Sequence, residues 1–511
     1  MNMRLYMQYI KRICLISFVQ VYSLSFAFAS DYSEMCNSIN ENSLPLINII
    51  VNYDALNTES FVNGEIEIAD YQKRTDEQNV FVRYLCKLRI RGIWASNLEK
   101  KSFAVKFVDH NGEELDVNLL GIRSDENWIL DAMAVDRIRM RNRICFDLWN
   151  DMSSTPYETK YGNRNGTLGE FVEVYINGAY FGLYCLTDKI NRKLLNLKKY
   201  DKKTNIVHGI LYKGESSRRA GHDLLSYENA DFNLKSWNAW NLQYPEDYPS
   251  EATWQPLMDL IDLCSPQTSD SQFISEYQNY FYVDNIVDFL VMTTAMNVGD
   301  NVYKNTMLST PDIQEGHRFL YSPWDMDHSL GGTYKGDYED DVADPHRYDN
   351  CAPFDRLYGK GLDGFPEKVS KRWNELKDGV FSIEHVNSLL EKYQDIFVSS
   401  GAWNREYNKW KDSGDDENLN KAELKEDLSA EIDYVKEWYF RNYAMLCDYW
   451  RMKGDANNDG KVNVADIVEI VNYIQENPSE KFVEKNADVN EDDEIDEKDA
   501  KAVVDIIFDT K

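Results

Sequence analysis

GDANNDGKVNVADIVEIVNYI, residues 454–474, is the stretch that decides the fold at the C-terminal end of this chain. A twelve-residue calcium loop places oxygen ligands at positions 1, 3, 5, 7, 9 and 12, and a glycine at position 6 makes its turn. Counted from Asp455, Gly460 falls at position 6. The stretch therefore predicts a calcium loop and then a helix from Ile467 to Ile474. The expected ligands are Asp455, Asn457, Asp459, the Lys461 carbonyl, Asn463 and Asp466.

A second loop of the same pattern begins 33 residues later, at Asp488, and its helix is expected from Ala500 to Phe508. Position 6 is Asp493 instead of glycine, which indicates a strained turn or a weaker site. The alternative is a solvated acidic tail, since residues 454–511 hold 17 Asp and Glu against 6 Lys. Two loops in register, each before an apolar helix, favour calcium. The second ligand set is Asp488, Asn490, Asp492, the Glu494 carbonyl, Asp496 and Asp499.

The duplicated module resembles a type I dockerin, because each loop ends in Asp at position 12 and is followed by a single helix. The resemblance implies a small all-α domain with two Ca²⁺ ions and a cohesin-like protein as partner. Positions 10 and 11, which help to choose the cohesin, are Val464-Ala465 and Glu497-Lys498 and differ from the familiar Ser-Thr pair. The cohesin type therefore stays open, and the module could instead anchor or stabilise the chain without a cohesin.

The first 29 residues have the features of a signal peptide. A basic flank precedes a mostly apolar run from Ile13 to Ala29, and Ala27-Phe28-Ala29 is a small-residue cleavage pattern. We expect cleavage before Ser30 and a secreted protein, extracellular or at the cell surface. The alternative is an N-terminal membrane anchor. No later run is long and apolar enough for a membrane span, so none is expected in the mature chain. The basic flank is Arg4, Lys11 and Arg12.

Composition limits the remaining possibilities. The 511 residues allow two to four domains, and 43% hydrophobic residues suffice for a sizeable core. A net charge of −31 argues against nucleic acid as a partner, because phosphate binding needs a basic surface. Seven cysteines follow the signal peptide without the paired spacing of a zinc site or a disulfide framework, so most are expected to be core thiols.

The order of elements predicts an α+β protein. We expect a signal peptide over 1–29, one domain over 31–450 with lobes at about 31–210 and 211–450, and the dockerin-like domain over 454–511. A polar loop is expected from Asn404 to Asn420. Strands are expected at Leu46–Val51, Ser102–Phe107, Phe171–Ile176 and Tyr180–Leu186, with a turn at Asn177-Gly178 between the last two. Helices are expected at Arg137–Trp149, Asp284–Met296 and Lys421–Trp450.

Several segments, in order, resemble the spore-coat protein kinase (CotH) family over residues 44–450. The resemblance implies a two-lobed atypical protein-kinase-like domain that uses ATP and Mg²⁺ or Mn²⁺ to phosphorylate protein Ser/Thr. The acceptor protein stays unknown. The segments include Arg91–Ser96 with Lys100–Phe103, Leu119-Leu120-Gly121 with Trp128–Leu130, Phe171–Gly178, Gly182–Tyr184 with Thr187-Asp188-Lys189, Leu211–Lys213, Asp300–Asn305, Pro323–Asp327 and Arg372-Trp373.

Phosphoryl transfer needs metal held against the phosphates and a carboxylate near the acceptor hydroxyl. Asp300 and Asn305 are five apart, as in a kinase catalytic loop. By resemblance, Asp300 is the catalytic-loop acid, Asn305 a metal ligand and Asp325 the metal aspartate, with Asp327 as a second candidate. His-Arg before Asp300 and Phe-Gly after Asp325 are both missing, which indicates an atypical kinase. His328 is interpreted as incidental.

The cation that binds the nucleotide is predicted less directly. Lys106, on the expected strand Ser102–Phe107, is the first candidate. Lys101 and Ser96 lie at or near the preceding loop, which could cover phosphates. Arg141 could contact phosphate or pair with a carboxylate. The alternative is that these basic residues form surface or structural ion pairs.

Three hypotheses follow from these features. The first is a secreted kinase or related nucleotide-using transferase tethered by its dockerin, although ATP is scarce outside a cell. The second is a non-catalytic scaffold or adhesion component of an extracellular polysaccharide-degrading assembly that keeps a kinase-like fold. The third is a carbohydrate-active partner in such an assembly, for which the sequence offers no carboxylate pair of defined separation.

Overall fold

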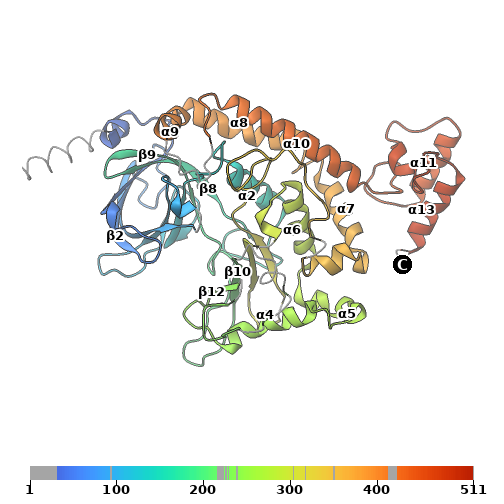
Figure 1. Ribbon diagram of the computed structural model, residues 1–511, viewed down its shortest axis with the longest axis horizontal. Helices are drawn as coiled ribbons and strands as arrows, with labels where there is room; N and C mark the ends of the chain where they lie inside the picture. The colour runs from blue at the N-terminus through green and yellow to red at the C-terminus, as the bar shows by residue number, and fades with distance from the viewer. Residues whose placement is uncertain are drawn as a thin grey trace, which may run out of the picture.

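The protein is elongated, with a β-barrel at one end and the duplicated-loop module at the other (Figure 1). We describe it from a computed structural model. The structure describes residues 31–509 apart from 93–94, 216–223, 225–226, 228–229, 238–239, 303, 317, 349–350 and 413–422. The predicted signal peptide, residues 1–29, lies outside the described residues. Helices and strands are mixed along the chain, which confirms the α+β prediction.

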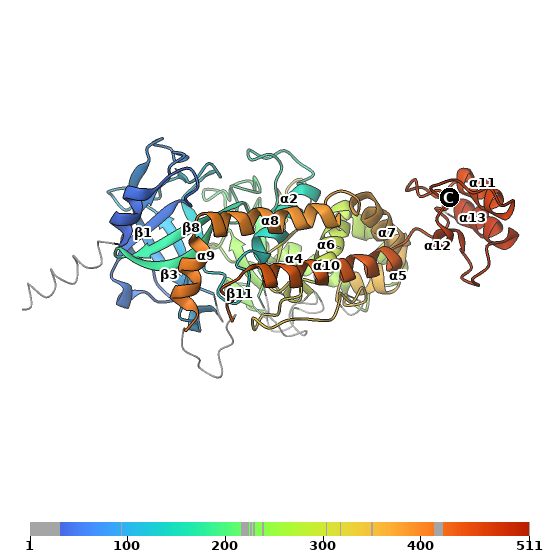
Figure 2. The same cartoon turned by 90° about the horizontal axis from the view of Figure 1, so that it is seen from above.

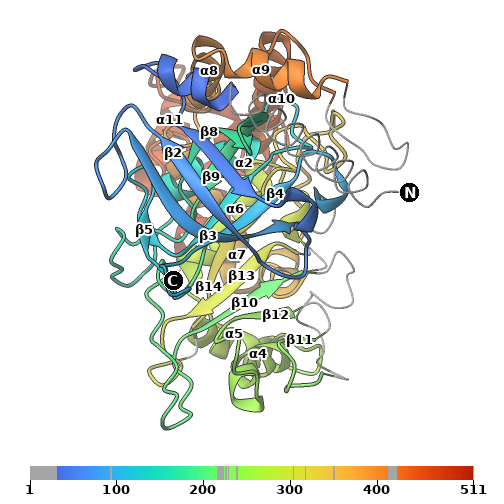
Figure 3. The same ribbon diagram turned by 90° about the vertical axis from the view of Figure 1, so that its left-hand side faces the viewer.

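The N-terminal part forms a closed barrel with strand order β1-β2-β3-β4-β7-β9-β8. Figure 3 views the molecule from the barrel end. Strand β1 pairs with β8 in parallel, and the other neighbours are antiparallel. The strands are β1 (Leu46–Val51), β2 (Val62–Ala69), β3 (Phe81–Arg91), β4 (Ser102–Phe107), β7 (Asn127–Asp131), β8 (Gly169–Ile176) and β9 (Ala179–Thr187).

Alternation along β4 decides which side chains face the barrel interior. Phe103, Val105 and Phe107 are buried in the barrel core, together with Trp128 of β7. Because neighbouring strand residues point to opposite faces, Lys106 points outward. The predicted strands Leu46–Val51 and Ser102–Phe107 are confirmed at their predicted bounds, and the predicted β8–β9 hairpin turns at Asn177 and Gly178.

The middle of the protein is built around a second sheet with strand order β11-β12-β10-β13-β14. Helix α6 is the buried helix expected between Asp284 and Met296, and it packs against β14 and α7. The strands are β10 (Ile210–Gly214), β11 (Ser236–Trp237), β12 (Trp240–Tyr244), β13 (Thr306–Thr310) and β14 (Leu320–Pro323). The short pair is β5 (Val117–Asn118) and β6 (Ser124–Asp125), and the helices are α2 (Arg141–Met152), α4 (Glu251–Cys264), α5 (Asp270–Tyr280), α6 (Val283–Ala295) and α7 (Phe365–Leu376).

Helix α2 begins four residues later than predicted. Arg139 has a left-handed φ of 58°, which a continuing α-helix excludes. The Asp136 carboxylate accepts from the Arg141 backbone N–H over 2.7 Å and so caps the helix at its true start. The basic segment is therefore divided between a tight turn and the helix itself.

Helices α8 (Ile383–Ser399) and α10 (Ser429–Tyr449) lie side by side and run the length of the middle part (Figure 2). The polar loop predicted from Asn404 is wrong over its first part, because α9 (Ala402–Trp410) is a helix that packs on β9 of the barrel. The long C-terminal helix starts at Ser429 instead of Lys421, since the Asp427 side chain accepts from the Ser429 N–H over 2.9 Å.

The C-terminal module holds α11 (Val464–Ile474), α12 (Glu484–Ala487) and α13 (Glu497–Asp509) around a small apolar core. Helices α11 and α13 each begin three residues before the predicted start. Asn463 caps α11, accepting from the Ala465 N–H over 2.8 Å, so helix and calcium loop overlap. Arg451 and Lys453, just after α10, pair with Glu491 of the second loop.

Two further predictions concern thiols and membranes. Cys86, Cys145, Cys185 and Cys264 are buried free thiols, as expected. Over the described part of residues 31–509, no helix is both long enough and apolar enough to cross a membrane.

Candidate functional site

The β13–β14 hairpin brings Asn305 and Asp325 together. Thr306 pairs with Pro323 in the ladder, so the residues before β13 and after β14 lie at the same end of the hairpin. The Trp324 N–H donates to the Asn305 carbonyl over 2.8 Å, and Asn305 Nδ2 donates to Asp325 Oδ2 over 3.4 Å. Two of the predicted metal ligands are therefore in contact.

Both residues have left-handed backbone conformations, each with φ of 58°. Asn and Asp tolerate this region better than other non-glycine residues. Asn301 stabilises the arrangement, because its Nδ2 donates to the Asn305 carbonyl over 2.7 Å and to the Trp324 carbonyl over 3.1 Å. Strained backbone held by its surroundings is typical of functional sites.

Asp300 lies in a turn that packs against the segment after Asp325. The Gly299 N–H donates to the His328 carbonyl over 3.0 Å, and a Cβ at Gly299 would collide with the His328 ring. Lys304 Nζ lies 2.7 Å from Asp300 Oδ2. His328 therefore sets the position of the Asp300 turn, a role that the sequence interpretation missed.

Negative charge is concentrated around Asp325. Burial raises the pKa of Asp325; Asp131 and Asp300 raise it further, while Arg91 and Lys213 oppose the shift. Burial also raises the pKa of Asp327 well above its usual value, and Asp325, Asp131 and Asp300 add to that shift. The Asp325 residue as a whole is nevertheless exposed to solvent, although its carboxyl is desolvated.

Asp131 and Asn142 belong to this site although the sequence interpretation missed them. Asn142 Nδ2 donates to Asp131 Oδ2 over 3.2 Å, and its Oδ1 accepts from the Met326 N–H over 3.0 Å. Asn142 thereby joins the end of β7 to the segment that carries Asp325 and Asp327. The signal was present, because Asp131 directly follows the quoted Trp128–Leu130 segment, but nothing in the spacing gave it a role.

The positive charges near Asp325 come from residues outside the predicted set of nucleotide contacts. Arg91 and Lys213 are the positive charges that act on Asp325. Burial lowers the pKa of Lys189; Glu246 opposes the shift, while Arg91 and Lys213 add to it, so Lys189 belongs to the same positive group. All three lie in segments that the sequence analysis quoted without assigning them chemistry.

The four predicted nucleotide contacts have other partners. Lys106 faces outward and pairs with Glu114 on the outside of the barrel. Lys101 Nζ donates to the Ser96 carbonyl over 2.8 Å, which closes the loop before β4. Arg141 is buried; its Nη1 lies 2.5 Å from Asp136 Oδ1 and its Nε is 3.4 Å from the Leu330 carbonyl. The structural ion pairs given as the alternative therefore describe Lys106 and Arg141.

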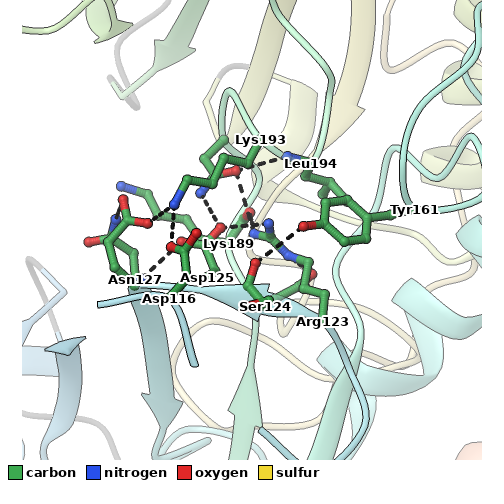
Figure 4. Close-up of polar contacts among 12 residues, drawn as sticks. Asp116, Arg123, Ser124, Asp125, Asn127, Tyr161, Lys189, Lys193 and Leu194 are labelled. Carbon is green, nitrogen blue, oxygen red and sulfur yellow. Dashed lines mark hydrogen bonds and ion pairs between the residues drawn. The ribbon is translucent and has the colours of Figure 1, made fainter. Parts of the chain in front are cut away.

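A second polar network lies around Arg123, between the short β5–β6 pair and the segment after β9 (Figure 4). The fully buried Arg123 guanidinium lies 2.6 Å from both Asp125 and Asp188, and it also donates to the Lys189 carbonyl over 2.8 Å. Arg164 contacts Asp188 over 3.0 Å. Asp188 is thus neutralised by two arginines, and the network holds the backbone of Lys189 in place.

The first calcium loop has the expected fold of backbone around its acidic side chains. The Asp459 and Gly460 N–H groups donate to the Asp455 carboxylate, each over 3.0 Å. The Asn457 and Asn463 N–H groups donate to the Asp466 carboxylate over 3.1 and 2.8 Å. These bonds orient the first and last predicted ligands of the loop and leave the remaining lone pairs of both carboxylates free of these N–H groups.

The second loop repeats this arrangement bond for bond. The Asp492 and Asp493 N–H groups donate to Asp488, each over 3.1 Å, and the Asn490 and Asp496 N–H groups donate to Asp499 over 3.2 and 3.0 Å. Asp493, in place of glycine, has a left-handed φ of 63°. The missing glycine therefore adds strain without changing the path of the loop.

The donor set fits calcium, which prefers a mixture of carboxylate, amide and carbonyl oxygens. Burial raises the pKa of Asp455 and of Asp466, and neighbouring carboxylates of the loop raise it further. A divalent cation would relieve this repulsion. Within the described ranges, no three His, Cys, Asp or Glu side chains gather into a metal-binding group on their own.

Two family models match the chain. The CotH kinase protein model matches residues 88–446, and the dockerin type I domain model matches residues 453–507. Because the first match covers more than half of the sequence, the chain belongs to the CotH kinase protein family. It carries a C-terminal type I dockerin domain. No curated protein matches the sequence.

The dockerin domain gives the coarse function. Dockerin domains bind Ca²⁺, and their presence implies a cohesin partner. The combination indicates an extracellular protein of the cellulosome type in which a CotH kinase family domain is attached to a docking module.

Proposed function

We propose that the protein is a secreted, atypical protein kinase-like phosphotransferase that its dockerin tethers to a cohesin. The observation that carries the proposal is the contact of Asn305 with Asp325, beside Asp300 and within a group of carboxylates faced by Arg91 and Lys213. The proposed lobes are the barrel part, residues 31–210, and the sheet-and-helix part, residues 211–450. The dockerin spans 454–511, and residues 1–29 form the export signal.

In the proposed reaction the acceptor hydroxyl oxygen attacks the γ-phosphorus of ATP. The bond from that phosphorus to the β–γ bridging oxygen breaks, ADP leaves, and the hydroxyl proton passes to the Asp300 carboxylate. Asp300 is a suitable acceptor because Lys304, 2.7 Å away, holds its carboxylate in place. Positioning and charge neutralisation provide most of the catalysis in such reactions.

Asp325 and Asn305 would hold Mg²⁺ or Mn²⁺, with Asp327 as a further ligand. Magnesium is usually bound by one or two protein carboxylates together with substrate phosphates, which fits a site short of three converging acidic side chains. The bound ion would neutralise phosphate charge. Arg91 and Lys213 replace Lys106 as the proposed contacts to the nucleotide phosphates, because their charges act on Asp325.

The test is transfer of labelled γ-phosphate from ATP by the mature protein with Mn²⁺ or Mg²⁺. Asp325→Asn is compared with Glu114→Gln, which removes an acidic side chain on the outside of the barrel. Labelling that disappears only in Asp325→Asn supports the proposal. No labelling and no ATP binding by the unmodified protein would leave the alternative, a non-catalytic scaffold or adhesion component of an extracellular polysaccharide-degrading assembly.

For the docking function, we propose α11 as the helix that meets the cohesin. Its outer face exposes an apolar row with exposed fractions of 65% at Val464, 51% at Val468 and 39% at Val471. The equivalent positions on α13 are Glu497 and Lys501, followed by a valine. Because the two repeats present unlike faces, a partner that buries apolar surface favours α11. Val468→Lys should weaken cohesin capture more than Lys501→Glu does, and an equal effect would contradict the assignment.

A further inference from the structure

Glu406, on α9, is a fully buried carboxylate that meets donors from distant segments of the chain. Its Oε1 lies 2.6 Å from Lys100 Nζ and 2.9 Å from Arg139 Nε, and its Oε2 accepts from the Leu183 N–H over 2.8 Å. The two cations and the backbone N–H satisfy this carboxylate. Together they hold the pKa of Glu406 below its usual value against the effect of burial. Two cations therefore face one carboxylate, which keeps Glu406 ionised, while burial lowers the pKa of Lys100 to about 7.

The close packing of α9 on the barrel makes this contact possible. Gly182 of β9 has φ of +148°, and a Cβ at this position would collide with Glu406, Lys100 and Trp410. Trp410 Nε1 donates to the Phe181 carbonyl over 2.9 Å on the same strand. Glycine at 182 thus admits the Glu406 side chain to the interior.

Arg139 carries the contact onward to the carboxylate site. Its Nη1 donates to the carbonyls of Met133, Ala134 and Asp136, over 2.6, 2.8 and 3.0 Å. These carbonyls belong to the turn between Asp131, at the end of β7, and the start of α2. Glu406 thereby fixes a guanidinium around which the whole turn is folded.

Residues at the end of that turn and at the start of α2 contact the segment after β14. Asp136 binds Arg141, whose Nε is 3.4 Å from the Leu330 carbonyl. Asn142 joins Asp131 to the Met326 N–H, as described above. Two polar paths therefore run from the turn around Arg139 to the segment of Asp325 and Asp327.

We propose that Glu406 is a positioning residue for the carboxylate site, acting through Arg139 on the turn that carries Asp131. The expected effect on phosphate transfer rests on the proposed function, whereas the expected effect on the fold of the turn does not. Glu406 touches neither substrate nor metal ligands; it sets how the turn is folded and, through Asn142, where the Asp325 segment lies. Buried polar groups of this kind fix geometry when every member has a partner.

Arg405 provides the matched control. It lies next to Glu406 on α9 and joins the same helix to the same barrel, with Nε and Nη2 each 2.7 Å from the Glu173 carboxylate. Glu173 lies on β8, and these contacts do not include Arg139 or the turn at 132–136. Arg405→Gln therefore removes a comparable link between α9 and the barrel and leaves the proposed path intact.

The experiment is hydrogen exchange on the full chain, for the unmodified protein, Glu406→Gln and Arg405→Gln. We expect both variants to exchange faster in α9. Only Glu406→Gln should also exchange about tenfold faster over residues 131–136 and 324–330, the segments that the path connects. Equal exchange of these two segments in both variants would overturn the proposal. If Glu406→Gln fails to fold, Arg139→Lys keeps the charge and removes the forked contacts to the turn carbonyls, and it should give the same pattern.

Binding and turnover separate this inference from the proposed function. Mn²⁺ alone, titrated by electron paramagnetic resonance, should bind about tenfold more weakly to Glu406→Gln and normally to Arg405→Gln, as expected for loss of a residue that supports metal ligands. If phosphate transfer is also detected, kcat should fall with little change in KM for ATP. Suppose that Glu406→Gln exchanges faster at 131–136 and 324–330 but the unmodified protein transfers no phosphate. That result would support the positioning role and contradict the proposed kinase activity.

Discussion

Asn305 and Asp325, 20 positions apart in the chain, meet side chain to side chain at 3.4 Å, and both adopt the left-handed backbone conformation. A hairpin alone would align only their backbones. The reversed φ of each residue instead turns the amide and the carboxylate toward one another at the end of β13 and β14. Substitutions can test separately the left-handed backbone conformation and the side-chain contact.

Asn305→Gly should leave folding nearly unchanged, because glycine adopts φ near +58° without strain. It should abolish Mn²⁺-dependent nucleotide binding, since the side-chain oxygen is lost. Asn305→Val should in addition destabilise the protein by about 1–2 kcal/mol, because a β-branched residue resists this conformation. Urea unfolding and nucleotide titration measure the two effects. Equal stability of both variants would show that the backbone is unstrained.

Arg91 and Lys213, not Lys106, should determine affinity for the phosphates. Arg91→Gln and Lys213→Gln should each weaken ATP binding about tenfold or more, as expected for loss of a charged contact. Lys106→Gln should change ATP binding less than twofold, because Lys106 pairs with Glu114 outside the barrel. Calorimetric titration with ATP and Mg²⁺ distinguishes the three variants. A large effect of Lys106→Gln would restore the sequence-based choice.

The calcium loops should show opposite pH dependence with and without metal. Burial raises the pKa of Asp455 and Asp466, so the folded metal-free module binds protons more tightly than the unfolded chain. Their stabilising contribution is complete below about pH 4 and is lost as the pH rises through the raised pKa values. Calcium requires the ionised carboxylates, so its stabilising effect grows over the same interval.

Calorimetry of the full chain should therefore show that the melting-temperature difference between calcium and chelator, for the dockerin transition, widens from about pH 4 to about pH 7. Asp466→Asn should remove most of this difference at the first loop. A difference that stays constant with pH would show that these two carboxylates do not control calcium binding.

Arg123 should be among the most sensitive positions in the barrel region. Arg123→Met leaves Asp125 and Asp188 buried with too little positive charge, and it should cost about 3–5 kcal/mol of the free energy of unfolding. Lys193→Met removes a more exposed cation from Asp116 (Figure 4) and from Glu126, and it should cost about 1 kcal/mol or less. Denaturant titration compares them. Similar losses would mean that the buried ion pairs add little.

The local pattern of apolar residues was sufficient to predict those elements in which that pattern matches the burial of the residues. The alternating β4 segment and the apolar α6 segment needed no distant partner to be recognised. Helix α9 was missed because contacts with the barrel stabilise its polar sequence. Arg405 pairs with Glu173, and the absence of a side chain at Gly182 leaves room for Glu406. The start of α2 was missed for a similar reason, since the left-handed φ of Arg139 depends on carbonyls and on Glu406.

The candidate site divides in the same way. Asn305 could be proposed from its spacing of five after Asp300, and Asp325 because it stands where a strand ends. Asp131, Asn142 and Arg91 could not, since their roles depend on which strand ends meet when the barrel closes. Lys106 was chosen for its alternating strand, but alternation alone does not say which face of a strand looks outward until the barrel core is known.

The junction after α10 has a consequence for assembly. Few residues separate Tyr449 from the first calcium ligand, and Arg451 and Lys453 both reach Glu491 in the second loop. The dockerin is therefore joined to the rest of the chain by a short connection that two ion pairs bridge. A cohesin bound to α11 would set both the place at which the domain is held and the direction in which its carboxylate site faces. Copies bound next to one another on a scaffold would then present their sites at different angles.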